Sequence, residues 1–446
     1  MNINTPAPRK KIAVIGSGIS GAAAAWSLNF TQDVTLFEAE SRAGGHTCTV
    51  DVDYDGTPIA VDVGFIVFNE RNYPNLCALF DFLGVKSEET NMSFALSLNG
   101  GQREWCGISL STVFSQKANI FSPSFLWMLR EVVRFNKQCL KDRDSGYLGT
   151  MTIGQYLNKR KFSKRFQDDY LIPMAAAIWS TPKIKMLAFP ALSFIQFFEN
   201  HRLLELEPPT WRTVSGGSRN YHQKLLSTLG DSVKLNTQIT ALHNNDDGSA
   251  SLTDQNGKIE HFDAVVFACH SDQARAILAA GNGPLETQSV LSDIKYKPNR
   301  VVLHRDVSFM PKRTKAWAAW NYMRETEANG DESEICLTYW MNRLQNIDSS
   351  KPLFVTLNPT REPDPAKVFG EWSFDHPQYD QAAFDAQKRI EFLQGNDNIF
   401  FAGAWTGFGF HEDGLRSGLE AAEALGGHVP WRSALPDALP IAVAAE

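Results

Sequence analysis

The stretch that decides the fold is KIAVIGSGISGAAAAWSLNFTQDVTLFEAESRAGGHT, residues 11–47. An apolar run at 12–15 predicts a short strand, and the turn GSGISG at 16–21 follows it directly. The alanine-rich run 22–28 predicts a helix, and the run 34–37 predicts a second strand that ends at Glu38. Strand, glycine turn, helix, strand and acid in this order are typical of a dinucleotide-binding βαβ unit.

The residues of the turn have separate tasks. Gly16 permits the bend, Gly18 lets the backbone approach a pyrophosphate, and Gly21 lets helix and strand pack closely. The other predicted contacts are Ser17, Ile19 and Ser20, because the first amides of the helix are offered to the anion. Glu38 would accept hydrogen bonds from ribose hydroxyls, which argues against a 2′-phosphate. A glycine-rich turn before an ordinary helix is the alternative.

The residues after the second strand separate FAD from NAD. EAESRAGG at 38–45 resembles the ExxxRxGG continuation of the flavin amine oxidase and phytoene desaturase superfamily, where the Arg and the glycine amides meet the FAD phosphates. A guanidinium suits that task because it is a forked donor whose charge is never lost. The resemblance implies FAD contacts at Ala39, Arg42, Gly44, Gly45, His46 and Thr47.

Two further segments carry the same resemblance. VDVGFI at 61–66 is similar to the family's strand and turn beside the isoalloxazine, which implies contacts at Gly64, Phe65 and Ile66. Residues 398–418 resemble the C-terminal signature, in which a strand delivers a glycine and a helix aims its amides at the reduced flavin. The implied contacts are Gly403, Ala404, Asp413, Gly414 and Leu415, and Ile239 is expected to join them.

A narrower resemblance concerns the substrate. YLIPMAAAIWS at 170–180, WRTVSGGS at 211–218 and FHEDG at 410–414 are similar to a bacterial subgroup of this superfamily. That subgroup is similar to the flavoprotein region fused ahead of plant cyclopropane fatty acid synthases, and it includes a bacterial desaturase of methylated fatty acyl chains. The resemblance implies an acyl lipid substrate.

Departures from the wider family bear on the chemistry. Many members carry an acid after the glycine of the C-terminal strand, where this chain has Ala404, and His411 stands where amine oxidases place an aromatic wall. No Cys follows a Ser-Gly-Gly segment, so the FAD is expected to be noncovalent. His411 could orient substrate or transfer a proton, or it could brace the following helix. Arg300, or Asn299, falls roughly where amine oxidases carry a catalytic Lys.

Three functions fit these residues. The first is an FAD oxidoreductase that takes a hydride and a proton from a carbon chain, desaturating or isomerising an acyl lipid. The second is an amine or amino acid oxidase that forms an imine and hydrogen peroxide. The third is a noncatalytic lipid or prenyl carrier on the same fold, against which the intact FAD-binding residues argue. The electron acceptor and the oligomeric state stay open.

Composition excludes other classes. The net charge of −7 argues against binding to nucleic acid. The six cysteines show no CxxC spacing that would indicate a metal site or disulfides. Without a signal peptide or an 18-residue apolar span, we expect a cytoplasmic protein whose membrane contact is at most peripheral. Basic and aromatic residues at 121–135 and 156–166 could contact anionic lipid; a core helix and a solvated face are the alternative.

The predicted fold class is α/β, α+β overall, with two interleaved domains. Residues 1–70, 210–290 and 395–430 are expected to form a Rossmann-like FAD domain. A substrate domain of mixed sheet and helices is expected from 71–209 and 291–394, and 431–446 is expected to be a flexible tail. Some aromatic residues outside the FAD domain could line an alkyl tunnel, although core packing is the simpler explanation: Phe114, Phe121, Phe125, Trp127, Phe135, Phe189, Phe194, Phe197 and Phe198.

Overall fold

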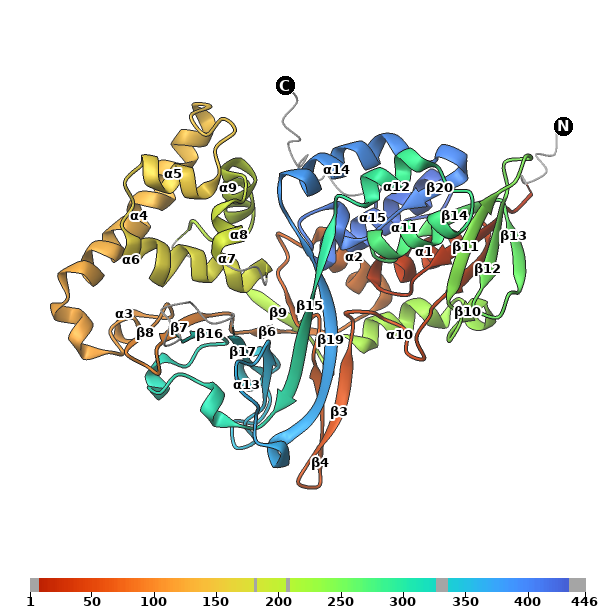
Figure 1. Ribbon diagram of the computed structural model, residues 1–446. Helices are drawn as coiled ribbons and strands as arrows, with labels where there is room; N and C mark the ends of the chain where they lie inside the picture. The colour runs from red at the N-terminus through yellow and green to blue at the C-terminus, as the bar shows by residue number, and fades with distance from the viewer. Residues whose placement is uncertain (1–7, 180–182, 206–208, 326–335, 433–446) are drawn as a thin grey trace.

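The computed structural model describes residues 8–179, 183–205, 209–325 and 336–432 (Figure 1). Nearly all of the predicted tail at 431–446, and Ser180 at the end of the segment 170–180, lie outside the described residues. The described elements form a mixed α/β fold, as the sequence predicts. Within this part of the chain, no helix combines the length and the apolarity needed to cross a bilayer.

A five-stranded parallel sheet carries the glycine-rich turn, in the order β10-β2-β1-β14-β20. Ile12 and Val14 pack into one hydrophobic cluster, and Ala13 and Ile15 pack into another. Both faces of the sheet are therefore buried, as expected of parallel strands that are continuous apolar runs. The strands are β1 (Lys11–Ile15), β2 (Asp33–Phe37), β10 (Val233–Lys234), β14 (Ala264–Phe267) and β20 (Ile399–Phe401).

Two layers cover this sheet (Figure 1). One face carries α1 and α15, which pack tightly because α1 is rich in alanine and α15 places Gly414 and Gly418 against it; α10 packs beside α1. The other face carries a small antiparallel sheet and three helices. These elements are α1 (Ile19–Asn29), α10 (Arg219–Ser227), α15 (His411–Ala424), β11 (Ile239–Asn244), β12 (Ala250–Asp254), β13 (Ile259–Phe262), α11 (Ser271–Ala280), α12 (Leu285–Leu291) and α14 (Gln381–Leu393).

A seven-stranded sheet and a helical lobe form the second part. The sheet order is β19-β15-β18-β17-β16-β7-β8, and only the β16–β7 pair is parallel. Its strands are β7 (Phe94–Leu98), β8 (Arg103–Cys106), β15 (Lys295–His304), β16 (Trp320–Arg324), β17 (Cys336–Trp340), β18 (Phe354–Leu357) and β19 (Val368–Gln378), with α13 (Met341–Leu344) after β17. The lobe contains α3 (Leu110–Val113), α4 (Pro123–Asp144), α5 (Ile153–Lys159), α6 (Lys164–Phe166), α7 (Ile172–Trp179), α8 (Lys183–Leu187) and α9 (Ala191–Asn200).

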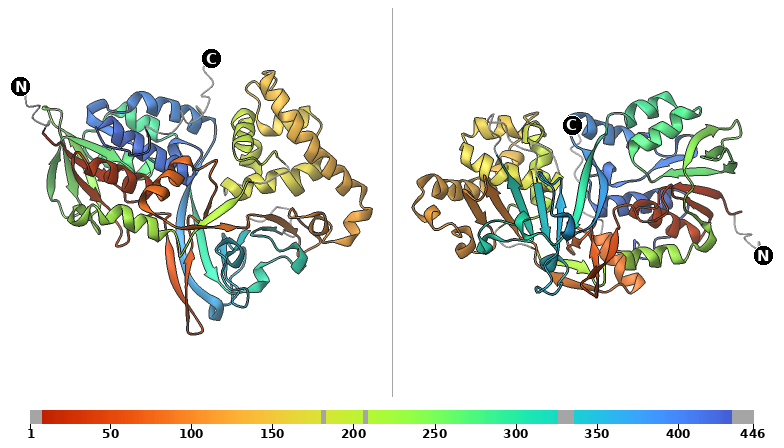
Figure 2. Two further views of the ribbon diagram at one scale, coloured as in Figure 1. Left: turned by 180° about the vertical axis from the view of Figure 1, so that it is seen from behind. Right: turned by 60° about the horizontal axis from the view of Figure 1, so that its bottom comes forward.

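The long strands β15 and β19 run between the two parts, as the view from behind in Figure 2 also shows. A hairpin of β3 (Thr49–Tyr54) and β4 (Thr57–Asp62) extends beside them in Figure 1. The sheet β5-β9-β6 links the parts through β5 (Val67–Phe68), β6 (Ser87–Thr90) and β9 (Trp211–Val214). The chain therefore passes between the parts several times.

Two helices that the sequence prediction placed in the substrate domain pack on the FAD-domain side. Leu76 and Leu79 of α2 (Pro74–Leu83) share a hydrophobic cluster with Trp26 and Tyr221. Ala386 of α14 shares a hydrophobic cluster with Ala13 and Ile15 of the parallel sheet. Each helix has an apolar face whose partners lie far away in the sequence, so the boundaries at 71 and 394 divide elements that pack together.

Candidate FAD and substrate site

The glycine-rich turn has the geometry that its motif predicts. Gly16 has a φ of +102°, and a Cβ on it would lie 2.8 Å from the carbonyl oxygen of Ala268. A Cβ on Gly21 would lie 1.8 Å from the Gly16 oxygen. A Cβ on Gly18 would meet no atom within 4 Å, because Gly18 faces open space. The turn therefore leaves a cradle above Gly18 in which a pyrophosphate fits.

Glu38 lies at the edge of this cradle. Its carboxylate accepts hydrogen bonds from the Ser17 amide at 3.0 Å, the Ser17 hydroxyl at 2.5 Å and the Glu40 amide at 2.9 Å. These bonds hold the acid at the end of β2, where ribose hydroxyls would reach it. Ala39 and Ile239 line the cavity next to Glu38.

The glycine pair at 44–45 lies directly beside the turn at 16–21. A Cβ on Gly45 would lie 3.4 Å from the Gly18 Cα, and the Gly44 amide donates to the Ser17 hydroxyl at 3.0 Å. Arg42 does not line the cavity: its guanidinium donates to the carbonyl oxygens of Ala43, Thr47 and Gly45 at 3.1, 3.0 and 2.8 Å. Arg42 therefore braces the loop that carries Gly44 and Gly45, and its contact with the FAD phosphates stays a prediction.

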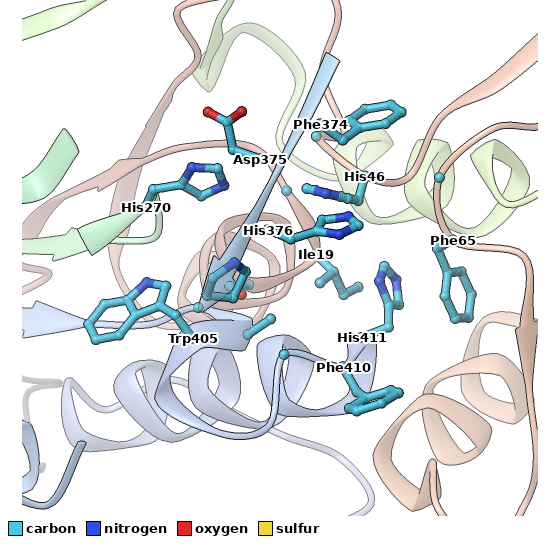
Figure 3. Close-up of a pocket in the computed structure, with 18 of the residues that line it drawn as sticks. Ile19, His46, Phe65, His270, Phe374, Asp375, His376, Trp405, Phe410 and His411 are labelled. Atoms are coloured by element: carbon cyan, nitrogen blue, oxygen red, sulfur yellow. The ribbon is translucent and has the colours of Figure 1, made fainter. Parts of the chain in front are cut away.

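A cavity of about 780 Å³ extends from this cradle to the substrate domain. Figure 3 shows aromatic and imidazole rings from several elements around it. Of the predicted site residues, those that line it are Gly16, Ser17, Gly18, Ile19, Ser20, Glu38, Ala39, Gly44, Gly45, His46, Gly64, Phe65, Ile66, Ile239, Gly403, Ala404 and His411. Those that do not are Gly21, Arg42, Thr47, Arg300, Asp413, Gly414 and Leu415.

The start of α15 is organised by residues behind the cavity wall. The Asp413 carboxylate accepts from the Phe408 and Phe410 amides, each at 3.0 Å. A Cβ on Gly414 would lie 2.9 Å from the Ser20 hydroxyl, so glycine lets α15 pack closely on α1. Leu415 is fully buried. These three residues set the direction of the helix, and His411 at its first position lines the cavity.

His411 is held by a stack and by a hydrogen-bond chain. Its ring lies on Phe65 with centroids 3.8 Å apart and planes 8° from parallel (Figure 3). Its Nε2 hydrogen-bonds the Tyr221 hydroxyl, which hydrogen-bonds the Thr47 hydroxyl at 2.7 Å. Thr47 and Tyr221 are buried, so Thr47, which is absent from the cavity wall, acts by holding Tyr221.

The direction of this chain follows from Thr47. Among the described residues, Tyr221 is the partner of the Thr47 hydroxyl, and we assign Thr47 as the donor because this satisfies its own proton. Tyr221 then donates to Nε2 of His411, which leaves the proton of the neutral ring on Nδ1. Burial lowers the pKa of His411 to about 3, so the ring is neutral near pH 7. His411 is therefore a hydrogen-bond donor at Nδ1.

Other imidazoles of the cavity are also neutral. The His46 ring lies 4.9 Å from Phe374 and 5.5 Å from His376, centroid to centroid. Burial lowers the pKa of His376 to about 4 and that of His46 well below its usual value. His270 stacks on Tyr296 with ring centroids 4.4 Å apart and also lines the cavity. Sequence reasoning missed His376 and Phe374 altogether, because nothing local in β19 distinguishes them.

Arg300 lies outside the site, and its catalytic assignment is not supported. Its guanidinium forms ion pairs with Glu362 at 2.7 Å and with Glu371 at 2.7 Å on the outside of the sheet. The next residue, Val301, lines the cavity. Because side chains alternate along a strand, Val301 and Arg300 point to opposite faces of β15. Asn299 is buried, and its amide donates to the Lys297 oxygen at 3.0 Å.

A dinucleotide-binding domain that shares one large cavity with an aromatic-lined second domain defines a two-domain flavoprotein oxidoreductase. The family model for flavin containing amine oxidoreductases matches residues 19–346, and the chain belongs to that family. It is an FAD-dependent oxidoreductase, and the cradle at Gly18, the glycine pair at 44–45 and Glu38 fit that cofactor. The resemblance to the flavin amine oxidase superfamily that the sequence showed is confirmed; the narrower resemblance to the acyl-desaturase subgroup stays a prediction.

Solved structures share the fold at low identity. Putrescine oxidase bound to putrescine has a TM-score of 0.66 at 15% identity, over 94% of this chain and 99% of that one. Cyclohexylamine oxidase from Brevibacterium oxydans IH-35A has a TM-score of 0.64 at 16% identity, with the same coverage. A CLA-producing fatty acid isomerase from P. acnes has a TM-score of 0.64 at 15% identity, over 94% and 98%.

NADH and NADPH are expected to reduce the flavin poorly. The turn at 215–218 is a further glycine-rich turn before a helix, but the Asp62 carboxylate accepts from its Ser218 amide at 3.0 Å. A carboxylate at that helix start repels a phosphate. Stopped-flow mixing under argon measures the rate; rapid bleaching of the flavin by either nucleotide would contradict this expectation.

Proposed function

We propose that the protein oxidises an apolar carbon chain, that of an acyl lipid, and forms or shifts a double bond in it. The observation that carries the proposal is the substrate-domain wall of the cavity. Its side chains are large and uncharged, and they include Ile178, Trp179, Phe197, Trp320, Val355 and Leu357. A long hydrocarbon gains free energy by leaving water for such a surface, about 0.8 kcal/mol for each buried CH₂.

The acids of the cavity weigh against an ammonium substrate. Among the described residues that line it, the carboxylates are Glu38, Glu40 and Asp375. Glu38 and Glu40 lie at the ribose end. Figure 3 places Asp375 near His270, away from Phe65 and His411. An amine near His411 would thus be desolvated without a charged partner, which is costly.

The chemistry divides between the cofactor and the chain. FAD, when bound, accepts the hydride that a substrate C–H bond gives up. The proton lost from the neighbouring carbon passes to a neutral imidazole of the cavity or to water. His411 lines the cavity, and a proton on its Nδ1 would let it stabilise negative charge that develops there.

Most of the aromatic set named from the sequence packs in the core, the simpler of the two explanations. Phe197 lines the cavity, whereas Phe125, Phe135, Phe189, Phe194 and Phe198 are buried in the core of the helical lobe. Packing therefore explains most of that set. The apolar character of the site comes instead from residues spread over α7, α9, β16 and β18.

An anaerobic substrate panel tests the proposal. The holoprotein would be mixed with extracted phospholipids, with free fatty acids and with mono- and diamines, and the flavin absorbance and the products would be followed. We expect altered double bonds in at least one acyl class and no appreciable bleaching by amines. Amines that bleach the flavin at enzymatic rates, and release peroxide in air, would instead establish the amine oxidase alternative.

A further inference from the structure

Several large apolar side chains are exposed on α4 and beside it. Phe121, just before the helix, is 85% exposed, and Trp127 on its first turns is 49% exposed. Leu110 on the neighbouring helix α3 is 78% exposed. Exposed apolar side chains of this size in one segment mark an interaction surface. Leu126 and Val133 continue the apolar surface along α4.

Cations follow the same face of the helix. Arg130, Arg134, Lys137 and Lys141 are exposed and recur at helical spacing, so they form one stripe. The opposite face of α4 is buried in the core through Phe125, Met128, Phe135 and Cys139. The helix is therefore anchored on one side and presents a basic and apolar stripe on the other.

The segment 107–164, which contains α3 and α4, has a net charge opposite in sign to that of the whole protein. Residues 107–164 contain ten Lys or Arg and three Asp or Glu, a net charge of +7 in a chain whose net charge is −7. Two of the three acids, Glu131 and Asp142, are buried. The exposed part of the segment is thus almost purely cationic. Figure 1 shows α3 and α4 at the far end of the molecule from the FAD domain.

We infer that this stripe, with Leu110 and Phe121, docks the protein on the surface of an anionic lipid bilayer. Lys and Arg beside large apolar residues on one helix face are what binding to a charged lipid interface requires, since the cations meet headgroups and the apolar side chains enter the acyl boundary. A nucleic acid would use the cations but would leave Leu110 and Phe121 in water. The inference does not depend on the proposed substrate.

The second basic stretch, at 156–166, contributes less than its sequence indicated. Arg160 forms an ion pair with the buried Asp142, whose other oxygen accepts from the Tyr156 hydroxyl at 2.8 Å. Arg165 pairs with the buried Asp169 at 3.3 Å. These two arginines hold the lobe together, so replacing them would test folding. Lys159 and Lys161 are exposed, and they belong to the same helical lobe as the stripe on α4.

The test uses the FAD-loaded protein and two kinds of vesicle, phosphatidylcholine alone and phosphatidylcholine with phosphatidylglycerol. We expect sedimentation with the anionic vesicles at low salt and less at high salt. Arg130→Gln/Lys137→Gln/Lys141→Gln should weaken partitioning by about 100-fold, since each cation near the surface contributes roughly a factor of five. Arg134 is kept because it donates to the Arg160 oxygen at 2.8 Å.

A matched control removes the same charge elsewhere. The control variant Lys234→Gln/Arg275→Gln/Lys388→Gln changes three exposed residues on β10, α11 and α14. It should bind the anionic vesicles as the unmodified protein does. Phe121→Ser/Trp127→Ser should lose the binding that persists in high salt. Equal sedimentation with both vesicles, none with either, or equal losses in the two charge variants would overturn the inference. Retained flavin absorbance shows that each variant is folded.

Discussion

Gly18→Leu should give a folded, colourless protein. Because a Cβ at this position meets nothing within 4 Å, the polypeptide itself tolerates a side chain there. The side chain would occupy the cradle in which the pyrophosphate fits. Because a leucine adds four carbon atoms there, the cost should reach the upper end of the 1–3 kcal/mol usual for overpacking, so FAD affinity should fall by about 100-fold. Flavin absorbance after gel filtration and titration of the protein with FAD measure the loss.

Gly21→Leu is the contrasting control. Its Cβ would lie 1.8 Å from the Gly16 oxygen, so this substitution should disrupt the packing of α1 on the sheet and prevent folding. Circular dichroism separates the two outcomes, because Gly18→Leu should keep the native spectrum. In the unmodified protein, acid precipitation should release the flavin into the supernatant. If the Gly18→Leu protein retained FAD as tightly as the unmodified protein, the pyrophosphate could not bind in the cradle above Gly18.

His411→Phe should keep FAD bound and slow reduction by the true substrate by about 10²-fold, the usual cost of removing a positioned donor or proton-transfer group. Phenylalanine preserves the stack on Phe65 while it removes the Nδ1 proton. Tyr221→Phe should slow the reaction less, roughly tenfold, because it frees the tautomer of His411 without removing the ring. Stopped-flow reduction and flavin titration together separate chemistry from binding.

The pH profile distinguishes a donor from a base that titrates near neutrality. The pKa of His411 is lowered to about 3, so the ring is neutral above about pH 4 and gains a proton only in stronger acid. The reduction rate should therefore show no break between pH 5 and 8 that is due to His411. A break near pH 6.5 that disappears in His411→Phe would show instead that this imidazole titrates at its ordinary value.

The parts of the site that are local in sequence could be predicted. The turn at 16–21, Glu38 and the glycine pair at 44–45 are set by backbone geometry within about thirty residues, and the structure brings them around one cradle. The family assignment followed from the same residues. Arg42 shows the limit of a motif, because its chain position is as expected while its guanidinium binds carbonyl oxygens of its own loop.

The parts that depend on distant segments could not be predicted. The neighbours of His411 are Phe65 and Tyr221, which come from other elements of the chain. The rings of Phe374 and His376 reach the cavity because β19 runs beside β15 between the two parts. Arg300 was assigned from a loose alignment, and the alternation of β15 would have favoured Val301. Helices α2 and α14 were misplaced because their partners lie far away in the sequence.

Product analysis after one anaerobic turnover tests the central claim most directly. Stoichiometric holoprotein would be mixed with phospholipids of defined acyl chains, and the chains would be analysed by mass spectrometry for the number and position of double bonds. The account predicts a new double bond with loss of two hydrogens for each flavin reduced, or a moved double bond with the flavin oxidised at the end. Unchanged acyl chains in every lipid and fatty acid tested, with bleaching by an amine, would contradict it.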